Sequence, residues 1–324
     1  MYRGFFGLSE CPFSVSPDPR YLFWTRRTQE SVAALAYAVH RRKGFILLTG
    51  EVGTGKTTLL NSLLEWLRNQ KIRSAFVSNS KLSHALHLLD FILADFGIVC
   101  ESREKSKILL ALRQWLLQQY RRGKTAVLII DEAQNLPDDL LEEVRLLTNL
   151  ETPSGKLLQI VLAGQPELDV RMQQPQLRQL RQRIVFHCQT AALTLEETEG
   201  YINARLRIAG ANETPVFSTG AVEAIYYYSH GIPRVINLLC EHALINSFAE
   251  EIRPVCARTV EDIARELQLD KVPPIAPAAW LDQTGEPSER IAGLLRNGFT
   301  ILRPGERPSS WQTTTEKRKH EQGL

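Results

Sequence analysis

The sequence predicts an α/β fold, a mostly parallel sheet with helices on both faces, followed by a small all-helical domain and a tail. Strand-like apolar runs alternate with helical patterns from residue 28 to about residue 190, which is typical of repeated strand–helix–strand units. After residue 190 the strand signal stops and only helical spacing continues. Six of the sixteen prolines then fall within residues 271–324, a composition that favours an extended segment.

The elements of the first half follow from periodicity and from stop signals. Residues 28–42 carry apolar side chains at helical spacing, and Gly44 ends the pattern. Residues 45–49, Phe-Ile-Leu-Leu-Thr, form an uninterrupted apolar run that predicts a buried strand. By the same criteria we expect further helices at 56–69, 82–96, 105–120 and 137–150, and further strands at 74–78, 125–130, 157–163 and 184–187.

The second half is predicted to be helical. Residues 194–197, Thr-Leu-Glu-Glu, form a capping box that opens a helix ending near Gly210. Further helices are expected at 218–229, 233–249 and 259–268. We therefore divide the chain into an N-terminal segment, an α/β domain, a helical domain and a mostly disordered tail, at residues 1–27, 28–190, 191–270 and 271–324.

Charge, cysteine spacing and the length of apolar runs limit the kinds of partner and compartment that we expect. The net charge of +3, from 39 basic and 36 acidic residues, argues neither for nor against a nucleic-acid partner. Five widely spaced cysteines predict reduced thiols. No run of about 18 apolar residues occurs, and the N-terminal residues lack a secretory signal. We expect no membrane span and a cytoplasmic location, with any attachment to the inner membrane made through partners.

Residues 50–57, Gly-Glu-Val-Gly-Thr-Gly-Lys-Thr, fit the phosphate-loop pattern and lie between a predicted strand and a predicted helix. Glycines let backbone N–H groups approach phosphate oxygens, and the helix N-terminus adds partial positive charge. The alternative is a plain glycine turn. The loop predicts a P-loop NTPase whose nucleotide contacts are Gly50, Glu51, Val52, Gly53, Thr54, Gly55, Lys56, Thr57 and Thr58.

Two side chains of this loop are predicted to carry specific chemistry. The ammonium group of Lys56 can reach the β- and γ-phosphates, and the hydroxyl of Thr57 can bind Mg²⁺. The expected cofactors are therefore ATP and Mg²⁺.

A second motif ends the predicted strand at 125–130. Asp131 and Glu132 follow this buried run directly, and buried carboxylates are costly unless a cation or water meets them. Asp131 would hold Mg²⁺ through water, as in a Walker B motif, and Glu132 would polarise the attacking water. The alternative is an acidic helix cap, which the phosphate loop upstream makes less favourable.

These motifs together resemble those of AAA+ ATPases. Within that class the chain is similar to the general-secretion-pathway A type, and also to ATPases from exopolysaccharide and protein-sorting loci and to transposon-encoded ATPase subunits. The resemblance covers residues 1–268 and implies a helical AAA+ lid. It is carried by Phe5-Phe-Gly-Leu8, Pro12-Phe13, Pro17-Asp-Pro-Arg20, the phosphate loop, Asp131-Glu-Ala-Gln134, Gly164-Gln-Pro-Glu-Leu168 and Gly231-Ile-Pro-Arg234.

The resemblance implies roles for three further polar residues. Gln165 occupies the sensor 1 position, from which it would orient water between the γ-phosphate and Glu132; an ordinary loop glutamine is the alternative. Arg234 matches the sensor 2 arginine, although a capping turn with a solvated arginine would look the same. Asn79 matches the residue that restrains the catalytic glutamate, or it is a turn asparagine. The N-terminal segment is expected near the nucleotide.

Residues 170–195 contain no acidic residue but hold four arginines. Such a run favours an arginine finger that completes a neighbouring subunit's site, and Arg178 and Arg181 are the candidates. Nucleic-acid contact and a solvated basic face are the alternatives. The finger implies an ATP-dependent oligomer.

Three functions remain open. The first is an ATPase that remodels a partner complex in secretion or exopolysaccharide export. The second is a DNA-associated ATPase of the transposition or initiator kind, which the near-neutral charge does not favour. The third is a scaffold that binds ATP without turnover, against which Glu132 argues.

Overall fold

The computed structural model describes residues 1–14, 16–78, 82, 84–212 and 214–269. The predicted tail and Asn79 lie outside these residues. Contacts divide the chain into two compact units. The α/β unit comprises the described residues of 27–52 and 56–190, and the helical unit comprises the described residues of 1–26, 53–55 and 191–269.

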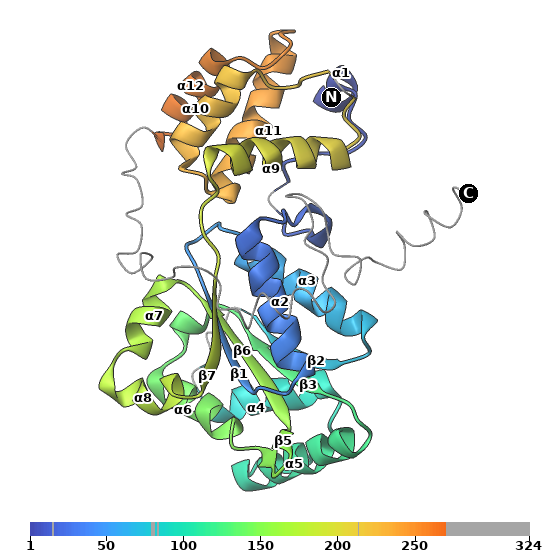
Figure 1. The fold of residues 1–324 in the computed structure, drawn as a ribbon, viewed down its shortest axis with the longest axis vertical. Helices are drawn as coiled ribbons and strands as arrows, with labels where there is room; N and C mark the ends of the chain where they lie inside the picture. Colours follow the sequence, from blue (N-terminus) through green and yellow to red (C-terminus); the bar gives the residue numbers. More distant parts are fainter. Residues whose placement is uncertain (15, 79–81, 83, 213, 270–324) are drawn as a thin grey trace, which may run out of the picture. The chain divides into compact units, whose positions relative to one another are not determined.

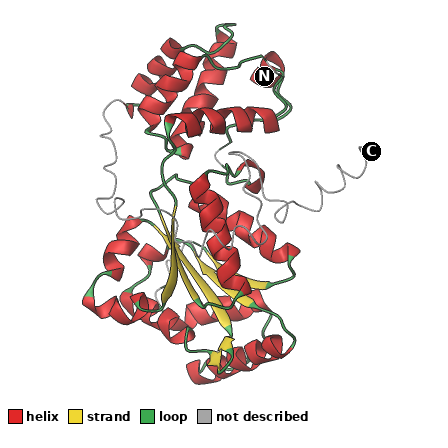
Figure 2. Ribbon diagram, viewed as in Figure 1, coloured by secondary structure: helices red, strands yellow, loops and turns green. Residues whose placement is uncertain are grey.

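The α/β unit contains a five-stranded sheet in the order β2-β3-β6-β1-β7 (Figures 1 and 2). All four strand pairings are parallel, which confirms the predicted sheet. The register places Thr49, the last residue of β1, beside Gly164, the last residue of β6. The strands are β1 Phe45–Thr49, β2 Arg73–Val77, β3 Ala126–Ile130, β6 Leu158–Gly164 and β7 Ile184–Gln189.

Helices cover both faces of this sheet. The predicted ones are present as α2 Arg26–His40, α3 Lys56–Asn69, α4 Ala85–Phe96, α5 Lys105–Arg121 and α6 Asp138–Leu147. Periodicity did not predict the short elements, which are α7 Pro166–Met172, α8 Arg178–Arg181, the 3₁₀ turns η2 Ala133–Asn135 and η3 Pro175–Leu177, and the hairpin of β4 Glu151–Thr152 and β5 Gly155–Lys156.

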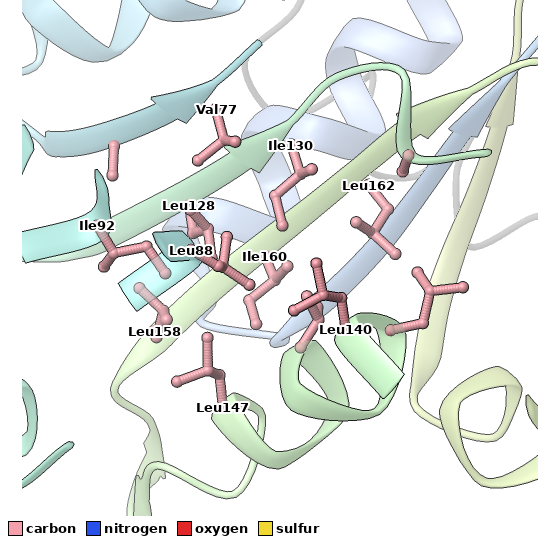
Figure 3. Packing of buried hydrophobic residues seen from close by; sticks show 14 of the residues in the cluster. Val77, Leu88, Ile92, Leu128, Ile130, Leu140, Leu147, Leu158, Ile160 and Leu162 are labelled. Atoms are coloured by element: carbon pink, nitrogen blue, oxygen red, sulfur yellow. The ribbon is translucent and has the colours of Figure 1, made fainter. Parts of the chain in front are cut away.

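Alternation along the buried strands divides the core of this unit into two layers. Leu128, Ile130, Ile160 and Leu162 pack in one cluster with side chains from α4 and α6 (Figure 3). The intervening residues are equally buried but point to the opposite face, on which α2 and α3 lie (Figure 1). Because both faces are covered, these strands are apolar throughout rather than alternating.

The helical unit contains α1 Tyr2–Phe6, η1 Pro19–Tyr21, α9 Leu195–Ile208, α10 Thr219–Ser229, α11 Pro233–Ala249 and α12 Ala257–Glu266. The capping box forms, since Thr194 Oγ1 accepts from the backbone N–H of Glu197 and the Glu197 carboxylate accepts from that of Thr194. No helix in the described part of the chain is long and apolar enough to cross a membrane.

The N-terminal residues pack on this helical unit. Tyr2, Phe6 and Phe13 share one hydrophobic cluster with α9 to α12. The buried Arg205 guanidinium donates to the Pro12 carbonyl oxygen at 2.5 Å and lies 4.3 Å from the ring centroid of Tyr21. A buried cation satisfied by backbone oxygens and an aromatic face fixes the segment without an ion pair.

Gly231 joins α10 to α11 at a close backbone crossing. Its φ is +73°, and a Cβ there would lie 2.0 Å from the carbonyl oxygen of Leu193. The Leu193 N–H also donates to the Gly231 carbonyl oxygen at 2.8 Å. Both the dihedral angle and the crossing therefore require glycine.

Substituting Gly231 should therefore destabilise the helical unit. We expect Gly231→Ala to lower the free energy of unfolding by about 2–4 kcal/mol, from the left-handed backbone and the overpacking together. Gly7→Ala is the matched control in the same unit, since its φ is +71° but its nearest contact is 3.8 Å. It should cost only about 1 kcal/mol in urea unfolding followed by circular dichroism. Equal losses for the two variants would contradict the crossing argument.

Candidate nucleotide and hydrolysis site

The predicted phosphate loop connects the end of β1 to the start of α3. A Cβ on Gly50 would lie 2.1 Å from Thr190 Oγ1 and 2.6 Å from the Thr190 carbonyl oxygen, so only glycine fits there. Gly53 and Gly55 have φ of +81° and +97°, a conformation that glycine adopts readily. Among the other loop residues Val52 is exposed, Thr54 is buried, and Glu51, Thr57 and Thr58 are half-buried.

Lys56 is buried beside the backbone of its own loop. Its Nζ donates to the carbonyl oxygens of Gly50 at 2.6 Å and Glu51 at 2.8 Å. Burial lowers the pKa of Lys56, and the charges of Glu132 and Asp131 oppose that shift. A buried cation whose hydrogen-bond partners are loop carbonyl oxygens is suited to bind a phosphate group, which carries more negative charge than a carbonyl oxygen.

The residue that follows β3, Asp131, contributes carboxylate oxygens that could bind a metal ion. Asp131 is 4% exposed, its Oδ2 accepts from Thr57 Oγ1 at 3.3 Å, and its Oδ1 accepts from the Glu132 N–H at 2.9 Å. Burial raises the pKa of Asp131. A carboxylate beside a hydroxyl fits Mg²⁺, which is bound by one or two protein oxygens together with water and phosphate oxygens. No three-residue cluster of metal ligands occurs among the described residues.

Glu132 is held by two glutamine side chains. Its backbone is left-handed, with φ of +55°, which is uncommon for a residue other than glycine. Its Oε2 accepts from Gln134 Nε2 at 2.5 Å and from Gln165 Nε2 at 3.2 Å. The Gln165 N–H donates in turn to Gln134 Oε1 at 3.1 Å. The structure therefore brings together Glu132 and Gln165, which are 33 residues apart in the chain.

Arg171 stabilises the position of Gln134, a role that sequence reasoning missed. Its Nη1 donates to the Gln134 carbonyl oxygen at 2.7 Å, and its Nη2 forms an ion pair with Asp138. Arg171 was visible only as a member of the acid-free run. Gln134 belongs to the Asp-Glu-Ala-Gln motif, but nothing in its spacing indicated that its side chain would bridge Glu132 and Gln165.

A second unpredicted contact lies at the start of the loop. His187 Nε2 is 2.9 Å from Thr49 Oγ1 and 3.1 Å from Asp169 Oδ1. It thereby links β7, the end of β1 and α7. A lone histidine in a strand carries no motif, and its partners are distant in the chain, so no sequence signal could have found it.

The arginines predicted as finger or sensor residues, and their neighbour Arg183, differ in their contacts. Arg178 and Arg181 are exposed on α8, and their side chains form no hydrogen bond or ion pair with any described residue. Arg183 donates to Asn149 Oδ1 at 3.2 Å. Arg234 is exposed at the start of α11, and its backbone N–H donates to the Gly53 carbonyl oxygen at 3.2 Å. The finger and sensor 2 roles stay predictions.

Comparisons with known proteins define the class. A family model described as an AAA domain matches residues 39–172. Solved structures share the fold at low identity. Drosophila ORC bound to DNA has a TM-score of 0.62 and 19% identity over 79% of this chain and 64% of that one. The Aeropyrum pernix ORC2 protein, in ADPNP–ADP complexes, has a TM-score of 0.55 and 17% identity, and the match covers 76% of this chain and 72% of that one. Fold and loop together define a P-loop protein of the AAA+ class.

A curated relative narrows this class. General secretion pathway protein A of Aeromonas hydrophila is 45% identical over 250 residues, which cover 77% of this chain and 45% of the relative. The chain thus spans less than half the length of the curated relative that it matches. Over the matched residues it is similar to the general-secretion-pathway A type of AAA+ protein.

The buried lysine generates a prediction about binding. We expect Lys56→Ala to abolish Mg-ATP binding measured by calorimetry, because the site loses the cation held at the loop backbone. Lys43→Ala is the control, since Lys43 is an exposed lysine of the same unit and lies two residues before β1. It should bind ATP as the native chain does. Equal, native-like affinities for both variants would rule out the phosphate-loop assignment.

Proposed function

We propose that this chain binds Mg-ATP at the phosphate loop, hydrolyses it with Glu132, and couples turnover to remodelling of a partner complex. The observation that carries the proposal is the position of Glu132. Its carboxylate accepts hydrogen bonds from Gln134 and Gln165. The residue directly before it is the buried Asp131, which contacts Thr57.

Each residue has a distinct task in this proposal. Thr57 and Asp131 would hold Mg²⁺, which neutralises charge on the β- and γ-phosphates when it is bound. Lys56 would bind the same phosphates. Glu132 would accept the proton of the attacking water, and Gln165, already bonded to Glu132, would orient that water.

The hydrolytic role predicts a specific defect. Glu132→Gln should retain ATP binding and lose about 10²–10⁴-fold in turnover, because an amide cannot accept the proton. Glu142→Gln is the control in the same unit; Glu142 pairs with Arg145 at the surface, so the change should leave turnover intact. Single-turnover hydrolysis by purified chain measures both. A loss below about threefold in Glu132→Gln would remove this carboxylate from the mechanism.

Self-association would complete the site. Arg178 and Arg181 are exposed and uncommitted among the described residues, as an arginine finger directed at another subunit would be. A contact of this head-to-tail kind closes into rings or extends into filaments. We therefore propose an ATP-dependent oligomer.

A mixing experiment tests the finger. An Arg178→Ala, Arg181→Ala double variant lacks the finger, and Lys56→Ala subunits lack nucleotide, so mixing the two inactive chains should restore part of the turnover. Each chain mixed with itself is the control. Full activity of the double variant alone, with turnover per subunit independent of protein concentration, would exclude a finger supplied in trans.

The name of the curated relative supports secretion as the process, with exopolysaccharide export as a related setting. We place the chain in the cytoplasm, with any attachment to the inner membrane made through a protein partner. The DNA-associated alternative is not favoured, because Arg171 and Arg183 bond within the α/β unit and only two arginines of the acid-free run stay uncommitted. Turnover assayed with and without DNA separates the two: stimulation by DNA would reverse this preference.

A further inference from the structure

An apolar hollow lies between α5 and α6, on helices that hold none of the proposed nucleotide contacts. It measures about 240 Å³, and five leucines dominate its lining. Two of them remain largely accessible to solvent: Leu110 is 53% exposed and Leu146 is 41% exposed. The other three are Leu109, Leu147 and Leu150. A cluster of this kind has a binding function more often than a lone exposed leucine does.

The charges around this leucine hollow are asymmetric. Glu143 lines it, but its carboxylate is already paired with Lys105. Arg113 also lines it, and its side chain forms no hydrogen bond or ion pair with another residue that the structure describes. The α5 helix carries four basic residues and no acidic one. The uncompensated charge at the hollow is therefore positive, and its occupant should carry a carboxylate.

The size of the leucine hollow limits what can fill it. Pockets for drug-sized ligands measure about 300–1,000 Å³, so 240 Å³ suits a few side chains better than a whole metabolite. A stable interface between two copies buries about 1,200–2,000 Å² in total, far more than a hollow on two helices offers. Amphipathic helices dock in such grooves through apolar side chains at helical spacing.

We propose that the leucine hollow docks a short amphipathic segment of a partner protein, with apolar side chains on Leu110 and Leu146 and a carboxylate at Arg113. This goes beyond the proposed function and does not rest on it. A segment bound on α6 would lie on the helix that begins at Asp138. Arg171 pairs with Asp138 and also donates to the Gln134 carbonyl oxygen, so α6 is linked to the residues that hold Glu132.

Peptide display on the full chain tests the proposal. Random peptides of about twelve residues, enough for three helical turns, are selected against the native protein. Selected peptides should carry leucine-like residues three or four positions apart with neighbouring acids. Their affinity should fall about tenfold or more in Leu110→Glu and Leu146→Glu, since each change removes a buried apolar contact and adds repulsion. Arg113→Glu should weaken acidic peptides and admit basic ones.

The controls separate this surface from the nucleotide site. Leu86→Glu alters a leucine of similar exposure, 38%, on α4 of the same unit, and should leave peptide affinity unchanged. Lys56→Ala should also bind the peptides normally, so failure of the ATPase proposal and failure of this one are distinguishable. Circular dichroism checks that each variant is folded.

Two outcomes would overturn the proposal. One is a selection in which no peptide loses affinity in Leu110→Glu or Leu146→Glu. The other is a concentration-dependent dimer of the native chain, seen by analytical ultracentrifugation and abolished by Leu146→Glu, which would make a second copy the occupant.

Discussion

The parallel direction of the central strands is the constraint on which the site depends. Because β1, β3 and β6 run the same way and pair in register, their carboxyl ends meet at one edge of the sheet, where ligands of α/β folds bind. Thr49, Asp131 and Gln165 all lie at such ends or just beyond them. One edge therefore holds the start of the phosphate loop, the Asp131 carboxylate and the Gln165 amide that is proposed to orient water, although long helical connections separate them in the chain.

Burying the charged groups at this edge of the sheet costs free energy when no nucleotide or metal is bound. Burial shifts the pKa of Lys56 down and that of Asp131 up, so in both cases the environment disfavours the charged form. Lys56 donates to carbonyl oxygens of its own loop, and Asp131 accepts hydrogen bonds from a hydroxyl and an N–H. Phosphate and Mg²⁺ together would supply the opposite charges, which is why binding and stability should be coupled at this site.

Sequence reasoning recovered the features that depend on local pattern. The bounds of β1 and α3 coincide with the expected ones, because an apolar run and a phosphate loop mark them directly. The five-residue α1 was missed, since so short a helix is stabilised by packing on the helical unit rather than by its own periodicity. The contacts of Arg171 and His187 were missed for a related reason. Each joins residues that meet only once the sheet has formed, and neither residue stands in a recognisable motif.

The division of the arginine run has a mechanistic consequence. Arg171 donates to the Gln134 carbonyl oxygen, and the Gln134 side chain donates to Glu132, so in the proposed mechanism this arginine helps to position the carboxylate within its own chain. Arg178 and Arg181 are exposed, and in the proposed oligomer they would act on a neighbouring subunit's site. A carboxylate that accepts from two amides has less capacity to accept a proton from water, so under the proposed mechanism turnover would require those bonds to loosen. The helices that begin just after this hydrogen-bonded group are α6 and α7. Under the proposed mechanism, contacts made on the outer surfaces of α6 and α7 would therefore be able to change the rate at which Glu132 acts.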